Sequence, residues 1–204
     1  MSNDLWKLTA AKITDGIATK SFSALEVVRS HLQRIEKVNH KVNAIVTLDT
    51  EFAIAQANEV DKRVQDGEKL RPLEGVPIGI KDTTAVKGMR TTYGSKFFEN
   101  YIPDSDDIIV DRIKASGAII LGKTNTPEFA AGGNTFNDIF GATRNPWNLK
   151  LSAGGSTGGG AAGLASGMFP LASGTDLGGS LRIPGAFCGV QGIRPTVGLV
   201  PAGP

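Results

Sequence analysis

Two serines lie inside glycine-rich segments in the last third of the sequence. Ser156 stands in GGSTGG (residues 154–159), and Ser180 stands in GTDLGGSLR (residues 174–182). More than half of the chain's 26 glycines lie between residues 154 and 198. Because glycine costs conformational entropy on folding, this density indicates backbone that approaches another group closely or holds a positive φ. A hydroxyl beside unhindered backbone N–H groups is what a nucleophile next to an oxyanion hole requires.

The base that would activate such a serine cannot be a downstream histidine. Residues 154–158 match G-x-S-x-G, the nucleophile elbow of α/β-hydrolases, but that mechanism needs a histidine after the serine. The two histidines, His31 and His40, both precede Ser156. We interpret both as ordinary surface histidines of the N-terminal helical region.

A lysine can replace histidine as the base if burial lowers its pKa toward neutrality. Lys81 directly follows the apolar run 76–80, and Lys123 also stands at the end of a predicted strand. Lys81 is the first candidate and Lys123 the second. The competing interpretation of Lys81, rated about equal on spacing alone, is a lysine that extends to the surface.

Other motifs lead to weaker hypotheses. Residues 158–163 match the dinucleotide pattern G-x-G-x-x-G, but glycine-rich loop precedes them and the next acidic residue, Asp176, comes too early. The single cysteine, Cys188, lies in an apolar run and is predicted to be a small buried residue.

The hydrophobic spacing predicts alternating helices and strands, which is typical of an α/β fold. Ser23 and Glu26 form a predicted capping box at the start of the strongest helix. Predicted helices cover 5–20, 23–39, 51–65, 104–116 and 158–168, with a short helix opening at Pro127; predicted strands cover 44–48, 76–80, 118–121, 169–172 and 187–190; and 132–147 is predicted as loop.

The composition limits the classes of protein to which this chain can belong. The chain has 204 residues, of which 40% are hydrophobic, enough for one domain with a real core. A net charge of +2 without a basic stripe gives no reason to expect a nucleic-acid partner. We expect no signal peptide and no membrane span, and by default a cytoplasmic protein.

Five segments together resemble the amidase signature family. In order, they are GVPIGIKD (75–82), GKTN (122–125), GATRNPW (141–147), GGSTGG (154–159) and GTDLGGS (174–180). The resemblance runs from about Leu8 to the last residue. It implies an α/β fold with a mixed β-sheet core covered by helices. It also implies that residues 1–204 form the N-terminal part of a single amidase signature domain, since family members continue beyond Pro204 and that remainder is absent here.

The resemblance also implies a Ser-Ser-Lys triad. Ser180 would be the nucleophile that forms the acyl-enzyme. Ser156, which in the family follows a cis peptide bond, would relay the proton of Ser180. Lys81 would be the neutral base behind Ser156.

Further roles follow from the same resemblance. An oxyanion hole would be formed by the backbone N–H groups of Leu177, Gly178, Gly179 and Ser180. An acyl pocket would be lined by Ala130, Ala131 and Gly132. Asp176 and Arg182 would pair to hold the serine loop. The sequence departs from the family where Thr157 replaces a common second serine and Ala153 a common proline, and neither change removes a catalytic group.

The implied activity is hydrolysis of a carboxamide to a carboxylate and ammonia or an amine, without metal or cofactor. The partner would be a small-molecule amide, and a homodimer is left open. Two alternatives stand beside this hypothesis: the A-type glutaminase subunit of a glutamyl-tRNA(Gln) amidotransferase, and a non-catalytic truncated fragment. A nucleotide-binding module is a distant third.

Overall fold

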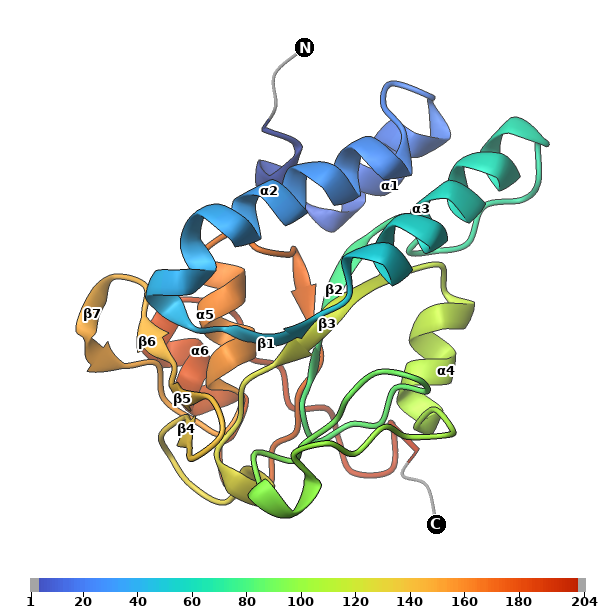
Figure 1. Cartoon of the computed structure of the whole chain (residues 1–204). Coiled ribbons are helices and arrows are strands. Elements are labelled where there is room, and N and C mark those ends of the chain that lie inside the picture. The colour runs from blue at the N-terminus through green and yellow to red at the C-terminus, as the bar shows by residue number, and fades with distance from the viewer. Residues whose placement is uncertain (1–3, 202–204) are drawn as a thin grey trace.

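A four-stranded mixed sheet forms the centre of the chain in the computed structural model, which describes residues 4–201 (Figure 1). The strand order is β1 (Ile45–Leu48), β3 (Ile119–Thr124), β2 (Pro77–Lys81) and β8 (Leu171–Ala172). Strand β3 runs antiparallel to β1 and parallel to β2, which in turn runs parallel to β8. This arrangement confirms the predicted fold class. Strand β3 continues beyond the predicted end at residue 121 and so contains Lys123.

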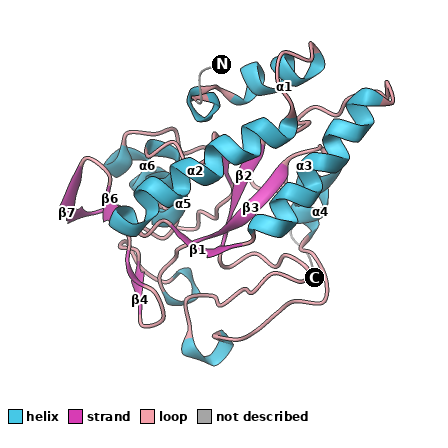
Figure 2. Cartoon of the chain, turned by 45° about the horizontal axis from the view of Figure 1, so that its top comes forward, coloured by secondary structure: helices cyan, strands magenta, loops and turns pink. Residues whose placement is uncertain are grey.

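Helices surround the sheet, as Figure 2 shows. They are α1 (Ala10–Ala18), α2 (Ala24–Val42), α3 (Thr50–Gln65), α4 (Ile108–Ala115), α5 (Gly158–Ala165) and α6 (Arg182–Cys188), with short 3₁₀ turns at Leu5–Lys7, Lys96–Phe98 and Glu128–Ala130. Two small hairpins lie largely in the region predicted as loop: β4 (Phe136–Asn137) with β5 (Gly141–Ala142), and β6 (Arg144–Asn145) with β7 (Asn148–Ser152).

Helix α2 begins as its sequence predicts. The Ser23 hydroxyl accepts from the Glu26 backbone N–H at 3.0 Å, and the Glu26 carboxylate accepts from the Ser23 N–H at 2.8 Å. This reciprocal pair satisfies two N–H groups that a helix start leaves without partners. The helix continues past the predicted end at residue 39 and ends at Asn43, which adopts the left-handed conformation with φ of 55°.

Two apolar cores cover the two faces of the sheet. The larger core joins residues of α1, α2, α3 and α5, and the smaller joins Ile78, Ile80, Ile120 and Val110 of α4. Because side chains alternate along a strand, Lys81 points away from the face that carries Ile78 and Ile80. Lys123 is the register partner of Ile80 and therefore lies on the smaller-core face. The two candidate lysines thus occupy opposite faces of the same sheet.

The prediction that His31 is a surface residue is wrong. Its side chain is 0% exposed, and its Nδ1–H donates to the Val27 carbonyl at 2.9 Å. Burial lowers the pKa of His31 to about 4, so the ring is neutral at pH 7. His31 lies four residues after Val27 and four before Ile35, both buried, so helical spacing places it on the inner face of α2. His40 is exposed, as predicted.

Several predicted elements differ from the structure at their ends or in type. The segment predicted as one helix over 5–20 is a 3₁₀ turn and α1, separated where Thr9 caps α1 with its side chain. Helix α4 is shorter than the predicted 104–116. The predicted strand 187–190 is wrong, because its first residues complete α6 and Gly189 ends that helix in the left-handed conformation.

Within residues 4–201, no helix combines the length and the apolar character that crossing a membrane requires.

Candidate active site

Lys81 ends strand β2 with its side chain fully buried, 0% exposed. Its Nζ lies 2.7 Å from Ser156 Oγ, 2.8 Å from Thr175 Oγ1 and 3.1 Å from Thr157 Oγ1. Burial lowers the pKa of Lys81 to about 7, while the negative charge of Asp176 acts in the opposite direction. A large fraction of Lys81 is therefore a neutral amine near pH 7, the form that can accept a proton.

Ser156 is 1% exposed and follows a cis peptide bond from Gly155, as the family resemblance implies. The segment 132–134 lies directly against this bond. A Cβ added to Gly155 would lie 2.8 Å from the Asn134 backbone nitrogen and 2.9 Å from the Gly132 carbonyl oxygen. Only glycine fits this approach, and the contact brings one end of the predicted acyl-pocket segment next to Ser156.

Ser180 is half-buried and precedes helix α6. Its carbonyl accepts from the Thr157 N–H at 3.1 Å, which ties the loop of Ser180 to the loop of Ser156. Among residues 4–201, no group forms a hydrogen bond with the Ser180 hydroxyl. The structure thus joins Lys81 to Ser156 directly, and it brings the backbone of Ser180 beside that pair without linking the two serine hydroxyls.

Asp176 organises the loop that carries Ser180. Its carboxylate, 1% exposed, accepts from the N–H groups of Gly179 at 2.8 Å and Leu181 at 3.1 Å. It also accepts from Arg182 Nε and Nη2, both at 3.0 Å, which confirms the predicted pair. The hydrogen bonds from Arg182 hold the pKa of the Asp176 carboxyl well below its usual range. The loop is therefore built around a permanent negative charge.

The hydrogen bonds within this loop determine which N–H groups of the predicted oxyanion hole are free. The N–H of Gly179 donates to Asp176 and is engaged. The N–H groups of Leu177, Gly178 and Ser180 donate to no group within the described part of the chain. These three amides are the ones that the structure leaves available to an oxyanion.

The predicted acyl-pocket residues lie in an open segment after the turn Glu128–Ala130. Ala130 is half-buried, whereas Ala131 and Gly132 are exposed. Phe129 and Ala130 both have positive φ, 50° and 58°, which is uncommon for residues with a Cβ. The N–H of Phe129 donates to the Tyr93 carbonyl at 2.7 Å, which fixes this turn against the loop that follows β2.

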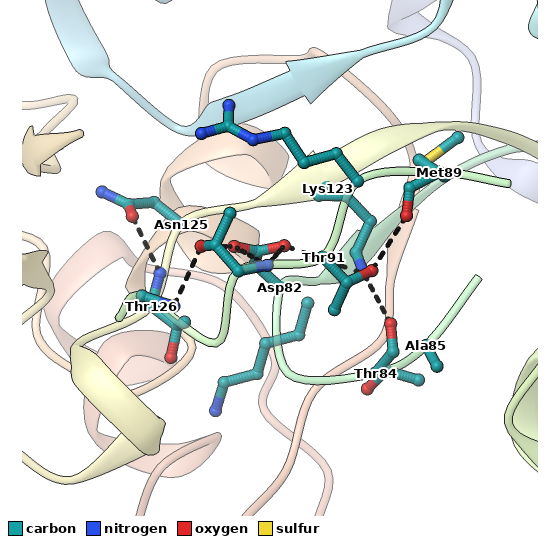
Figure 3. Close-up of polar contacts among 12 residues, drawn as sticks. Asp82, Thr84, Ala85, Met89, Thr91, Lys123, Asn125 and Thr126 are labelled. Carbon is teal, nitrogen blue, oxygen red and sulfur yellow. Dashed lines mark hydrogen bonds and ion pairs between the residues drawn. The ribbon is translucent and has the colours of Figure 1, made fainter. Parts of the chain in front are cut away.

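Lys123, the second candidate base, belongs to a separate cluster (Figure 3). Its fully buried Nζ donates to the Thr84 carbonyl at 2.5 Å and to Thr91 Oγ1 at 2.7 Å, and it lies 3.8 Å from Asp82 Oδ1. Burial lowers the pKa of Lys123 to about 8, while the Asp82 carboxylate acts in the opposite direction. Lys123 contacts neither Ser156 nor Ser180 within the described residues, so it is not placed to activate either serine.

Two threonines that contact Lys81 are not predicted from the sequence. There, Thr157 is only a departure from the family pattern, and Thr175 is only part of a glycine motif. The available signal is their position, since each adjoins a candidate loop residue: Thr157 follows Ser156 and Thr175 precedes Asp176.

A cavity of about 1140 Å³ lies between α4, α5, the open edge of β8 and the segment 190–201. Thr157 and Asp176 line it, but Lys81, Ser156 and Ser180 do not, so it adjoins the candidate site without containing the reactive groups. In the part of the chain that the structure describes, no cluster of three or more His, Cys, Asp or Glu side chains is placed to share a metal ion. Cys188 is buried, as predicted, and burial raises its pKa to about 11.

Comparisons with known proteins find relatives over most of the chain. The model of the Amidase family matches residues 26–204. The chain is 47% identical over 197 residues to the A-type subunit of the glutamyl-tRNA(Gln) amidotransferase of Carboxydothermus hydrogenoformans, covering 97% of this chain and 41% of the relative. It is 45% identical over 194 residues to an acylamidase of Rhodococcus erythropolis, covering 95% of this chain and 41% of that protein.

Comparison with solved structures also finds a member of the amidase signature family. A bacterial aryl acylamidase of the amidase signature family superposes with a TM-score of 0.84 at 36% identity, covering 88% of this chain and 37% of the other. The 6-aminohexanoate cyclic dimer hydrolase gives a TM-score of 0.83 at 34% identity, covering 91% and 37%. The chain therefore spans only about two fifths of the length of these proteins. With its fold and its family-model match, the chain belongs to the amidase signature family.

Proposed function

We propose that this chain carries the reactive serines and the base of an amide hydrolase. The observation that supports this most directly is the 2.7 Å contact between the buried Nζ of Lys81 and the hydroxyl of Ser156. A lysine whose pKa lies near 7 can take a proton from a hydroxyl at working pH, whereas an exposed lysine cannot. The names of its relatives, among them an acylamidase and an aryl acylamidase, support the same chemistry.

In the proposed reaction, Ser180 Oγ attacks the carbonyl carbon of a carboxamide. Its proton passes to Ser156, and the proton of Ser156 passes to neutral Lys81. The C–O bond of the acyl-enzyme forms, and the C–N bond breaks as the nitrogen takes back a proton through the same relay. Water, activated in turn by the relay, then attacks the acyl-enzyme and releases the carboxylate and free Ser180.

The negative charge that develops on the carbonyl oxygen would be met by the N–H groups of Leu177, Gly178 and Ser180. Gly179 would contribute indirectly, because its N–H anchors the loop on Asp176 at 2.8 Å. Preorganised amide donors of this kind are among the largest contributions to acyl-transfer catalysis. The small-molecule amide would reach the site past Ala130, Ala131 and Gly132, the last of which lies beside Gly155.

The test is covalent labelling of the chain with a fluorophosphonate, followed by intact-protein mass. One adduct on wild type, absent from Ser180→Ala and strongly reduced in Lys81→Met, is the expected result. Ser105→Ala is the matched control, because Ser105 is exposed and lies outside the site. An unlabelled wild type, or an adduct that survives in Ser180→Ala, would contradict the proposal for these 204 residues.

The second candidate function is that of a glutaminase component of an amidotransferase. It is favoured by relatives at 47% and 48% identity that are named as the A-type subunit of glutamyl-tRNA(Gln) amidotransferase. Both functions use the same acyl-enzyme chemistry and differ in the amide. Comparing turnover of glutamine with turnover of a simple anilide separates them. Hydrolysis of the anilide by the chain without partner proteins supports the hydrolase, and exclusive use of glutamine supports the glutaminase.

A further inference from the structure

Three hydroxyl groups surround the Nζ of Lys81, and only one of them belongs to a serine. Besides Ser156 at 2.7 Å, Thr175 Oγ1 lies at 2.8 Å and Thr157 Oγ1 at 3.1 Å. A neutral lysine amine has two N–H groups and one lone pair. Two acceptors that hold the two N–H groups therefore leave the lone pair directed at the third partner, which here is the Ser156 hydroxyl.

The hydroxyl of Thr157 is oriented to accept an N–H from Lys81. Its Oγ1 lies 3.4 Å from the Thr175 carbonyl oxygen, a long hydrogen bond in which the threonine can only be the donor, because a carbonyl oxygen only accepts. With its proton turned toward that carbonyl, Thr157 Oγ1 presents a lone pair to Lys81. It therefore accepts an N–H from Lys81 and does not compete with Ser156 as a proton donor.

The methyl group of Thr157 fixes this direction. A Cβ added to Gly174 would lie 2.5 Å from Thr157 Cγ2, and one added to Gly160 would lie 3.0 Å from it. The methyl thus fills the space that these two glycines leave free. A β-branched side chain has few accessible χ1 rotamers, and this packing selects one of them. A serine at position 157 would keep the hydroxyl but lose the group that holds its rotamer.

We propose that Thr157 and Thr175 are positioning residues that hold the two N–H groups of Lys81 and so aim its lone pair at Ser156, with the methyl of Thr157 locking the arrangement. This inference rests on the proposed function, in which Lys81 is the base. It assigns a role to a residue that differs from the serine common at position 157 in the family.

The test compares four variants by the pH dependence of fluorophosphonate labelling at Ser180. Thr157→Val keeps the shape and removes the hydroxyl, Thr157→Ser keeps the hydroxyl and removes the methyl, and Thr175→Val removes the second acceptor. Thr91→Val is the matched control, because the buried Thr91 hydroxyl likewise accepts from a buried lysine, Lys123, at 2.7 Å and donates to a carbonyl, that of Met89, at 3.1 Å.

The expected result is a loss of about tenfold or more in labelling rate for Thr157→Val and Thr175→Val that persists at high pH, where Lys81 is neutral in every variant. Thr157→Ser should lose only a few-fold, and Thr91→Val should label at the wild-type rate. Labelling of Thr157→Val at the wild-type rate on the high-pH plateau would overturn the proposal. If Thr157→Val does not fold, Thr175→Val decides the same question.

A second readout does not depend on turnover. In protein labelled with ¹³C at lysine Cε, the Lys81 signal, assigned through Lys81→Met, is titrated by NMR. Removing an acceptor destabilises the ammonium form, so Thr157→Val and Thr175→Val should move the Lys81 titration to lower pH, and Thr91→Val should not. If wild type takes no label, the proposed function fails; unchanged titration in both Val variants instead shows that the threonines do not hold Lys81.

Discussion

Lys81 and Lys123 are both fully buried at the ends of adjacent strands, yet their surroundings differ in kind. Lys81 contacts three hydroxyl groups, whereas Lys123 contacts a carbonyl and a hydroxyl and lies 3.8 Å from the Asp82 carboxylate. Burial lowers the pKa of both, to about 7 and about 8. Burial alone therefore does not make a lysine suitable as a general base. The Ser156 hydroxyl can deliver a proton to Lys81. The Thr84 carbonyl and the Asp82 carboxylate beside Lys123 can only hold an ammonium in place, and the Thr91 hydroxyl donates its proton to the Met89 carbonyl.

The largest expected difference between the two lysines is in the reactivity of Ser180. Lys81→Met should lower the rate of fluorophosphonate labelling by at least about 100-fold, because a general base contributes about 10²–10⁴-fold. Lys123→Met, which removes an equally buried ammonium from the opposite face of the sheet, should leave the rate of the folded protein within about threefold. Rates are measured by intact mass and normalised to the folded fraction.

An equal loss of labelling rate in Lys81→Met and Lys123→Met would contradict this prediction. It would mean that each lysine affects the reactivity of Ser180 only by stabilising the fold. A Lys81→Arg variant sharpens the test. Arginine keeps a positive charge and donors but is not deprotonated at accessible pH, so it should be as inactive as methionine.

The second expected difference is in stability. Lys123→Met leaves Asp82 buried and hydrogen-bonded to Thr92, without an ion-pair contact to any cation among the described residues. Removing one member of a buried ion pair costs about 3–5 kcal/mol, whereas removing both often costs much less. Guanidinium unfolding should therefore show that Asp82→Asn/Lys123→Met is more stable than Lys123→Met. Lys81→Met leaves no contacting carboxylate behind and should therefore lose less stability than Lys123→Met.

If the double variant is less stable than Lys123→Met, the cluster in Figure 3 is not held by compensating charges. The hydrogen bonds from Lys123 to Thr84 and Thr91 would then account for its stability.

The sequence is sufficient to select the two lysines but not to separate them. Both end predicted strands, and a lysine at the end of an apolar strand is unusual enough to mark each as a candidate. Their partners lie far away along the chain: Ser156 is 75 residues and Thr175 is 94 residues from Lys81. From the sequence, only the family resemblance places Lys81 with Ser156, and nothing in the spacing indicates the threonines.

The wrong predictions have local causes that the sequence does contain. The surface assignment of His31 follows from placing it on or near the solvated face of its helix, although its spacing from Val27 and Ile35 puts it on the buried stripe of α2. The strand predicted over 187–190 follows from its apolar run, although Gly189 is a typical residue for the end of a helix. The spacing from individual buried residues and the helix-ending glycine are the better guides in these two cases.

The smallest expected difference is in how stability depends on pH. The native pKa of Lys81, about 7, lies below the ordinary value of 10.5, so between these pH values the unfolded chain binds a proton that the native chain does not. The free energy of unfolding should therefore rise with pH across this window, by up to about 1.4 kcal/mol per pH unit. Lys123 acts in the same direction over the narrower range from about 8 to 10.5.

Replacing Lys81 by methionine should remove its share of this slope, most clearly between about pH 7 and 8, where Lys123 contributes less. Replacing Lys123 should change the slope mainly above about pH 8. Lys150→Met, on the exposed part of β7, is the control and should leave the slope unaltered. Identical slopes for Lys81→Met and wild type would mean that Lys81 has the same pKa in the folded chain as in the unfolded chain. A lysine in that state could not serve as the neutral base, whatever its distance from Ser156.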